Sequence, residues 1–490
     1  MAKSMEDCKE LTKNNVIGQI VTKSSDRLSS PSFWQDIKEA IQGTEADYTS
    51  INLNKAILLL AIPMMLELIM ESTFAIVDIF FVGRLGASAV ATVGLTETYL
   101  FLLYSLAMGL ATAVTAIVAR RIGEKDRDSA GKSAVQAIFL GLMCSVPFAL
   151  AGIFLSRPLL ELMGADQWIL EKGFRYTQWM LGGNLVIVLI FVINAVFRGA
   201  GDAAIAMRIL FISNGINLLL DPLLIFGLGP FPELGIQGAA IATTIGRATG
   251  VAVQLWLLFK GGKHIQVKIS QVIIESKIMI GLIRTSLGGV GQMLVAMTSW
   301  IFLMRILASI GSEAVAGSTI ALRITMFTLM PAWGMSNAAA TLVGQNLGAG
   351  NPDRAESSVW KIGFYNMIFL LGVSVIYFLF NRSLMSIFSN DEAVIKIGAT
   401  WLKILSYSYF VYGWWMVSVQ AFNGSGDTRT PTMINLVFFW LIEIPLSYVL
   451  AIVLGWGSGG VFWGVFIAET AVGLFTLWLF KKGGWKTNKV

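Results

Sequence analysis

IPMMLELIMESTFAIVDIFFVGRLG, residues 62–86, is an apolar stretch long enough to cross a lipid bilayer, because about 20 helical residues span the hydrocarbon core. It nonetheless carries three carboxylates, Glu67, Glu71 and Asp78. In a helix, steps of four and seven residues place all three within roughly 40° of one line. Acids facing lipid are very costly, so we expect this face to line a bundle interior or a water-filled cavity. Pro63 removes a backbone donor one turn before Glu67 and predicts a bend there.

The composition indicates a membrane protein with many spans. Of the 490 residues, 55% are hydrophobic and 13% are charged, whereas soluble domains carry about 25% charged residues. The two cysteines, Cys8 and Cys144, lie in a polar tail and an apolar run, and they imply no disulfide framework. The single histidine, His264, lies in a basic loop, where we expect it to be satisfied or solvated. Without a Cys/His cluster we expect no metal site.

Apolar runs recur along the chain and predict an all-α membrane protein with twelve transmembrane helices. Their approximate limits are 56–81, 90–118, 133–155, 174–197, 204–226, 235–259, 278–307, 318–342, 359–380, 400–422, 431–454 and 460–480. Because the number of spans is even, both termini should lie on one side of the membrane.

The spans divide the chain into segments. We expect a polar N-terminal tail over 1–50, a six-helix bundle over 51–260, a linker over 261–277, a second six-helix bundle over 278–480 and a basic tail over 481–490.

The N-terminal tail contains one amphipathic stretch. Phe33, Trp34, Ile37 and Ile41 share a helical face, which predicts a short interfacial helix. A disordered tail is the alternative.

Basic residues gather in the loops after even-numbered spans and in the C-terminal tail. Examples are Arg120, Lys125, Arg198, Arg354 and Lys486. Loops rich in Lys and Arg remain in the cytoplasm, so we expect both termini to be cytoplasmic. The net charge of +6 then reflects topology, and we expect no nucleic-acid partner.

The chain repeats itself at a constant shift. The shift aligns Gly86 with Gly311, Gly109 with Gly334, Gly123 with Gly348, and FRGAGD at 197–202 with FNGSGD at 422–427. A constant shift over more than a hundred residues predicts two six-span halves that enter the membrane from the same side. Such halves usually rock about a cavity between them, although a duplication retained only for packing is the alternative.

The acids within the spans are not repeated. We expect the first half to bury Glu67, Glu71, Asp78, Glu97 and Asp221, whereas the second half has only Glu443 and Glu469 at the depth of the spans. This asymmetry predicts that ion coupling belongs to the first bundle.

Asp78, Asn217 and Asp221 are the main candidates for ion coupling. A carboxylate at the position of Asp78 can load and release a proton or bind Na⁺ through its oxygens, with a structural salt bridge as the alternative. Asn217 and Asp221 lie one turn apart just before Pro222, which indicates a second part of the site or a helix-end cap. Arg247 should pair with Glu71 or Glu97.

Methionine and aromatic residues gather in the second half. Met326, Met330, Trp333 and Trp414 are candidates for a substrate cavity, since such side chains suit flat apolar ligands. Helix packing is the alternative. The sequence has no P-loop, nucleophile elbow or HExxH motif, so we expect no enzymatic activity and no cofactor.

Taken together, these features resemble the multidrug and toxic compound extrusion (MATE) family. The resemblance is carried by the P-x14-D pattern of Pro63 and Asp78 followed by VGRLG, by the duplicated F-x-G-x-G-D turns, and by LVGQNLGAGNPDRAE at 342–356. It covers about residues 56–480 and implies a secondary antiporter that exports cationic or amphipathic organic compounds in exchange for H⁺ or Na⁺.

The resemblance also implies site residues. The coupling aspartate of the family falls on Asp78, its fifth-span Asn/Asp pair on Asn217 and Asp221, and its associated polar groups on Asn194 and on Thr243 or Thr244.

The second bundle departs from one branch of the family. Spans 278–307 and 400–422 lack carboxylates, which resembles the DinF-like rather than the NorM-like branch and favours H⁺ over Na⁺. Glu67, Glu71, Glu97 and Arg247 fall outside the general pattern, and we expect them to tune Asp78 or to recognise a particular cation.

These inferences predict a monomer in a bacterial-type inner (plasma) membrane that binds small organic molecules. The main alternative is a lipid-linked oligosaccharide flippase, whose pyrophosphate cargo would require several basic residues in the cavity. A non-transporting sensor or scaffold is a third class.

Overall fold

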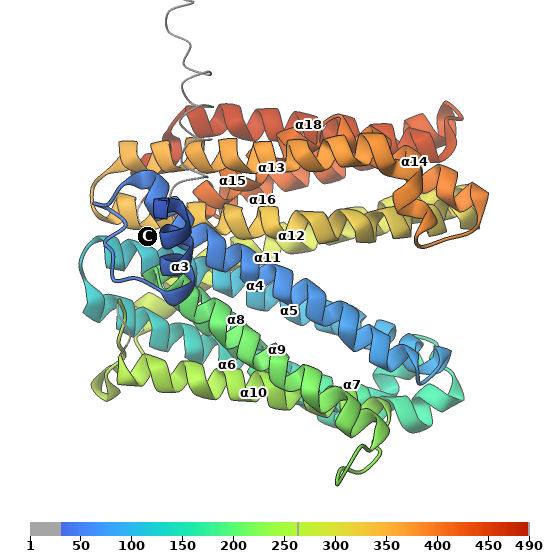
Figure 1. Cartoon of the computed structure of the whole chain (residues 1–490), viewed down its shortest axis with the longest axis horizontal. Helices are drawn as coiled ribbons and strands as arrows, with labels where there is room; N and C mark the ends of the chain where they lie inside the picture. Colours follow the sequence, from blue (N-terminus) through green and yellow to red (C-terminus); the bar gives the residue numbers. More distant parts are fainter. Residues whose placement is uncertain (1–30, 262–263, 489–490) are drawn as a thin grey trace, which may run out of the picture.

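The computed structural model describes residues 31–261 and 264–488, and within these ranges it contains helices and no strands (Figure 1). The first half comprises α3 (Pro31–Gln42), α4 (Leu53–Gly83), α5 (Ala87–Gly123), α6 (Arg127–Leu162), η1 (Ile169–Gly173), α7 (Phe174–Gly182), α8 (Asn184–Ala200), α9 (Ala203–Phe226) and α10 (Ile236–Lys260). The linker contains η2 (Ile269–Gln271). The second half comprises α11 (Ser276–Ile310), α12 (Ser312–Gly348), α13 (Pro352–Ser386), α14 (Glu392–Ser406), α15 (Tyr409–Gly424), α16 (Arg429–Asn435), η3 (Leu436–Glu443), α17 (Ile444–Tyr448), η4 (Val449–Val453), α18 (Gly457–Lys481) and η5 (Gly484–Thr487).

Eleven helical stretches in the described ranges are long and apolar enough to cross a membrane. They account for every predicted span except the tenth, 400–422. That region forms two helices, α14 with 15 residues and α15 with 16 residues, separated by a turn at Tyr407 and Ser408. Because the two helices follow one another directly, the tenth crossing is a broken helix rather than a continuous one.

The helix that carries the three acids has well-defined ends. Asn52 caps α4 by accepting a hydrogen bond from the backbone N–H of Asn54 at 3.0 Å. The helix then continues through Pro63, which lies inside α4 and is buried. The bend expected at Pro63 stays a prediction. After α4 ends, Gly86 adopts φ 104°, a conformation that glycine reaches without a Cβ clash. The VGRLG motif is thus the tight turn between α4 and α5.

Hydrophobic clusters pack each half and then join the two. One large cluster belongs mainly to the first half, and another belongs to the second. A further cluster brings Tyr48 and Leu60 together with Leu342, Phe422 and Trp485. We call the end of the molecule where this cluster, α3 and η5 lie the terminal face. In Figure 1, α4 and α12 meet at this end and diverge towards the opposite end.

The internal repeat is visible in the interface between the halves. A Cβ at Gly109 of α5 would lie 2.5 Å from the backbone nitrogen of Val290 in α11, and one at Gly334 of α12 would lie 2.6 Å from the carbonyl oxygen of Met64 in α4. Since the repeat relates α4 to α11 and α5 to α12, these are two equivalent contacts. The matched glycines therefore allow helices of opposite halves to approach closely.

Residues 31–52 are packed onto the rest of the fold. The amphipathic stretch forms α3, and Lys55 of α4 holds it through Glu39 at 2.7 Å and Asp36 at 3.4 Å. Residues 43–52, which we call the N-terminal strap, connect α3 to α4. The rest of the predicted tail, including Cys8, lies outside the described residues.

Candidate functional site

The acidic face of α4 is turned towards α8, α9 and α10. Glu67 is 2% exposed, and Glu71 and Asp78 are half-buried. The prediction that these three acids share one face of the helix is confirmed, because all of them interact with residues of α8, α9 or α10. Their partners differ from one acid to the next, and these differences define the site.

Glu67 is neutralised within a network of polar side chains. Its Oε1 accepts hydrogen bonds from Arg198 Nη1 at 3.1 Å and from Asn194 Nδ2 at 3.2 Å. Gln254 Nε2 donates to Asn194 Oδ1 at 2.6 Å. Arg198, which the sequence suggested to be a loop charge, thus lies in α8 with its guanidinium largely buried. Asn194, which the resemblance assigns to the polar groups associated with the coupling residues, belongs to the network around Glu67.

Glu71 is also paired with an arginine. Arg247 Nη2 forms a close ion pair with Glu71 Oε1, and Asn214 Nδ2 donates to Glu71 Oε2 at 3.2 Å. The predicted pairing of Arg247 with Glu71 or Glu97 is therefore confirmed for Glu71. The Arg247 guanidinium also lies 5.7 Å from the centroid of the Phe74 ring, which adds a cation–π contact.

Asp78 and Asp221 form no ion pair with any residue in the described ranges. Asn217 Nδ2 donates to Asp221 Oδ1 at 3.4 Å and to Thr243 Oγ1 at 3.0 Å. Three buried oxygens have no hydrogen-bond partner among the described residues: Asp78 Oδ1, Asn217 Oδ1 and Asp221 Oδ2. Asp78 and Asp221 are close enough to interact electrostatically. The structure therefore brings together Asp78, Asn217, Asp221 and Thr243.

This group of oxygens suits the capture of a proton or a small hard cation. A carboxylate without a partner inside a membrane protein is stabilised by binding either one. Asp221, Asn217 and Thr243 offer carboxylate, amide and hydroxyl oxygens, which are the ligands that hard cations prefer. Thr244, the alternative to Thr243, instead donates to the carbonyl of Ala240 at 2.8 Å. Across the described ranges, no group of three or more His, Cys, Asp or Glu residues could hold a metal ion.

Glu97 is placed differently from the expectation. We predicted a buried acid, but its side chain is exposed and forms no ion pair within the described part of the chain. It interacts electrostatically with Asp78 and with Arg323 of α12. Because Glu97 lies on α5 and Arg323 on α12, this interaction runs from one half to the other. Within the described part of the chain, Glu443 of the second half forms no ion pair with Arg323.

The aromatic and methionine candidates separate into two groups. Met326, Met330 and Trp333 lie on one side of α12, and Met326 is 39% exposed. Trp414 packs against α13, where its Nε1 donates to Met367 Sδ at 3.1 Å. This placement corresponds to the packing alternative for Trp414. The other three side chains stay candidates for substrate contact.

Sequence reasoning missed three polar residues of the first half. Asn214 lies one turn before Asn217, and Gln254 lies two turns after Arg247, so helical spacing could have identified both. Arg198 directly precedes the glycine-rich turn at 199–201. Because Arg198 lies next to that turn, the sequence suggests a loop residue, whereas the side chain extends back along α8 into the bundle.

The family model described as MatE matches residues 63–223 and 290–449 of the chain. The chain belongs to this family. The match falls on two segments of equal architecture, one in each half, as expected for MATE proteins that contain an internal repeat. The protein is therefore a multi-pass membrane transporter and not an enzyme.

Relatives and solved structures agree with this assignment. A probable multidrug resistance protein NorM from Thermotoga maritima is 27% identical, with 89% of this chain and 94% of that protein covered. An FAD transporter from Shewanella oneidensis is also 27% identical, with 81% and 88% covered. A solved multidrug resistance MATE transporter in an outward-facing conformation has a TM-score of 0.84 at 24% identity, with 91% and 99% covered. The last comparison establishes the MATE fold.

Proposed function

We propose that the protein is an antiporter that exports cationic or amphipathic organic compounds in exchange for H⁺, with Na⁺ as the alternative coupling ion. One observation carries the proposal. Arginines neutralise Glu67 and Glu71 of α4, whereas Asp78 and Asp221 have no cationic partner among the described residues and keep unpartnered buried oxygens. Two nearby carboxylates in this state are well suited to bind and release a coupling ion.

The transport cycle follows from competition between the ion and the substrate. In the inward-facing state, Asp78 and Asp221 are charged, and a cationic substrate binds between the halves. In the outward-facing state, proton binding to Asp78 removes the attraction for the substrate and bends α4 near Pro63. Release of the proton to the cytoplasm resets the transporter. The proton drives the cycle only through its different affinities for the two states.

The distribution of basic residues supports an orientation in the membrane. Four basic side chains lie at the terminal face: Arg120, Lys125, Arg354 and Lys486. Lys125 and Arg354 bind the strap, whereas Arg120 and Lys486 join the C-terminal segment to α5 and α13. By the positive-inside rule, we assign this face to the cytoplasm of a bacterial-type plasma membrane. A monomer suffices for this mechanism, because the two halves of one chain provide both sides of the cavity.

The arrangement of charges disfavours the flippase alternative. A pyrophosphate cargo would require several free cations inside the cavity, but Arg198 and Arg247 are already bound to Glu67 and Glu71. Arg323 is exposed and has no ion pair within the described ranges. It supports a second candidate, an aromatic substrate with one anionic group, and the relative named as an FAD transporter makes flavins the first compounds to test.

The proposal is tested in proteoliposomes loaded with a fluorescent organic cation. We expect a pH gradient alone to drive transport in the wild type and to have no effect in Asp78→Asn. Transport driven only by a Na⁺ gradient would assign the same group of residues to Na⁺. If neither gradient moves the dye, drug export is rejected for this protein, and a flavin in the same assay then tests the second candidate.

A further inference from the structure

The N-terminal strap is bonded to both halves of the transporter at the terminal face. On the first half, Tyr48 Oη donates to the carbonyl of Gly201 at 3.1 Å. On the second half, Arg354 donates to the carbonyl of Tyr48 at 3.1 Å and, through a closer contact, to that of Ile51. Tyr48 is 2% exposed. A single buried residue of the strap therefore connects α8 to α13.

The linker between the halves is bonded to the same strap. His264 is 8% exposed. Its Nδ1 lies 2.7 Å from Asp202 Oδ1 at the start of α9, and its Nε2 lies 3.3 Å from the carbonyl of Ala46 in the strap. The imidazole thus joins the first half to the strap, and the strap continues to the second half.

Beneath the strap, the turn at 197–202 also bonds directly to the second half. Thr341 Oγ1 donates to the carbonyl of Arg198 at 3.1 Å, and Gln345 Nε2 donates to that of Gly199 at 3.0 Å. Arg198 extends in the opposite direction to Glu67 of α4. Alternating access requires the halves to part at this face. The bonds from Thr341 and Gln345 must then break, together with the bonds of the strap to one of the two halves.

We propose that the strap is a latch that holds the halves together at the terminal face, and that it is released when His264 loses a proton. The proposal goes beyond the antiport cycle and relies on the proposed function only for the orientation of this face. A proton taken up at the latch would favour the state closed to the cytoplasm.

The geometry around His264 favours the protonated imidazole. Both ring nitrogens face acceptors, a carboxylate and a carbonyl, and only the doubly protonated ring can donate to both. Burial opposes the charge, but the hydrogen bond and charge of Asp202 together with the Ala46 carbonyl outweigh it and raise the pKa of His264 above its usual value. Arg127 at the start of α6 acts in the opposite direction.

Several other charged and polar groups surround His264. Glu45, Asp47, Tyr48, Lys125 and Arg127 line a small cavity with it. Burial would raise the pKa of Asp47, but hydrogen bonds from Lys125 and Thr49 lower it to about 2, so the Asp47–Lys125 ion pair persists. Burial raises the pKa of Tyr48, which keeps its hydroxyl a donor. His264 is therefore the group of the latch whose charge we expect to change near neutrality, because imidazole is the side chain that ordinarily titrates there.

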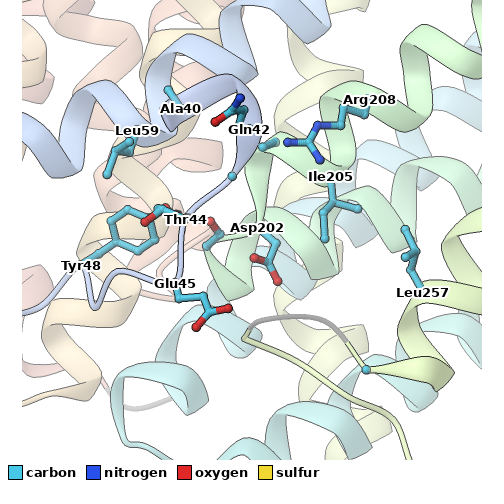
Figure 2. A pocket seen from close by; sticks show the side chains of 14 residues that line it. Ala40, Gln42, Thr44, Glu45, Tyr48, Leu59, Asp202, Ile205, Arg208 and Leu257 are labelled. Carbon is cyan, nitrogen blue, oxygen red and sulfur yellow. Dashed lines mark hydrogen bonds between the residues drawn. The ribbon is translucent and has the colours of Figure 1, made fainter. Parts of the chain in front are cut away.

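The strap is also separated from the first half over part of its length. A cavity of about 410 Å³ lies between the strap, α9 and α10. Figure 2 shows Thr44, Glu45 and Tyr48 of the strap on one side of it, and Asp202 and Arg208 on the other. Asp202 Oδ2 is buried without a hydrogen-bond partner among the described residues. Beside this cavity the strap does not pack against α9 and α10, so its attachment there depends on discrete bonds, whereas Tyr48 also packs in the cluster that joins the halves.

The sign of the pH effect follows from the raised pKa of His264. The closed latch binds the proton more tightly than the open one, so closure is favoured at low pH and lost as the pH rises through the pKa of the closed state. Each unit of difference between the two pKa values changes the ratio of closed to open molecules about tenfold. In a transporter that imports protons, this would slow turnover as the cytoplasm becomes acidic.

The latch is tested by measuring the distance between the halves with spin labels. Lys260 at the end of α10 and Ser357 in α13 are exposed at the terminal face, and each is replaced by cysteine in a full chain without Cys8 and Cys144. We expect a short distance at about pH 6 and a growing population at a longer distance towards about pH 8.5. His264→Gln should abolish most of this dependence, and Tyr48→Phe should increase the longer distance at every pH.

Controls separate the latch from the coupling site. Ser50→Ala removes an exposed bond within the strap and should behave like the wild type. In an Asp78→Asn background, the pH response should persist, because it arises at His264. A pH response unchanged by His264→Gln would reject His264 as the switch, and distances unaffected by both His264→Gln and Tyr48→Phe would overturn the latch itself. Neither result would depend on whether Asp78 couples transport.

Discussion

At the scale of single residues, the first half places similar acids in different surroundings. Glu67 and Glu71 lie one turn apart on α4, and each binds its own arginine, Arg198 and Arg247. Asp78, two turns further along, has none within the described ranges. Position along one helix therefore separates acids that hold the bundle together from an acid that is free to bind an ion.

The Glu71–Arg247 pair leads to a prediction about stability. Arg247→Met should leave Glu71 without its cationic partner and lower the free energy of unfolding by about 3 to 5 kcal/mol, since an uncompensated buried charge is costly. The cost should fall towards the lower value because Glu71 retains 28% side-chain exposure. Thermal unfolding in detergent measures the change as a lower Tm.

The double variant provides the control for this prediction. Glu71→Gln combined with Arg247→Met removes both charges, and we expect it to recover most of the lost stability. If the double variant is as unstable as the sum of the two single variants, the ion pair contributes no coupling energy, and the assignment of Glu71 to a structural role is wrong.

At the scale of helices, the contacts between the halves depend on glycines that the repeat conserves within the chain. α12 crosses α4 at Gly334, and α11 crosses α5 at Gly109. These crossings lie nearer the terminal face than the divergent end. They set how closely the halves approach when that face is closed.

A side chain at this crossing should disrupt the closed state. In Gly334→Val, the Cβ would lie 2.6 Å from Met64 O and 2.7 Å from Met65 Cα. Because these are backbone atoms that cannot rotate away, we expect a cost of about 1 to 3 kcal/mol or a separation of the helices. A lower Tm, or a longer distance between labels at 260 and 357, would report it.

The matched control is a glycine in a helix with free space around it. No heavy atom lies within 4 Å of a Cβ built at Gly372 of α13, so Gly372→Ala should be neutral or slightly stabilising. Equal effects of Gly334→Val and Gly372→Ala would show that the crossing is not limited by close backbone approach.

At the scale of the whole molecule, the two halves share an architecture but differ in chemistry. The second half contains Glu443, which is buried and interacts electrostatically with Glu469, and neither acid forms an ion pair within the described ranges. The second half has its own network of amides, but its members are the uncharged side chains of Gln292, Asn337, Gln420 and Asn423. A symmetric scaffold with an asymmetric set of polar groups suits a division of labour, in which one half binds the ion and both halves move.

This asymmetry predicts different outcomes for two matched substitutions. Glu443→Gln should preserve transport driven by a pH gradient, because its carboxylate lies outside the group formed by Asp78, Asn217 and Asp221. Asp78→Asn should abolish it. The comparison is made in the same proteoliposome assay, and loss of coupling in Glu443→Gln would refute the assignment of coupling to the first half alone.

The sequence by itself determined the membrane class, the positions of the spans, the repeat and the family. Those features arise from local properties, because hydrophobic length, helical spacing and turn residues act within one segment of the chain. The shared face of Glu67, Glu71 and Asp78 and the one-turn spacing of Asn217 and Asp221 were predictable for the same reason.

Only the tertiary structure decided which groups meet. It paired Glu67 with Arg198, placed Asn194 in that network, exposed Glu97, and packed Trp414 against α13. Each of these outcomes depends on the rotation of one helix against another, which spacing along a single helix does not specify. The role of the strap could not be predicted for a further reason. Its bonds to both halves are made largely with backbone carbonyls, which are present in every sequence.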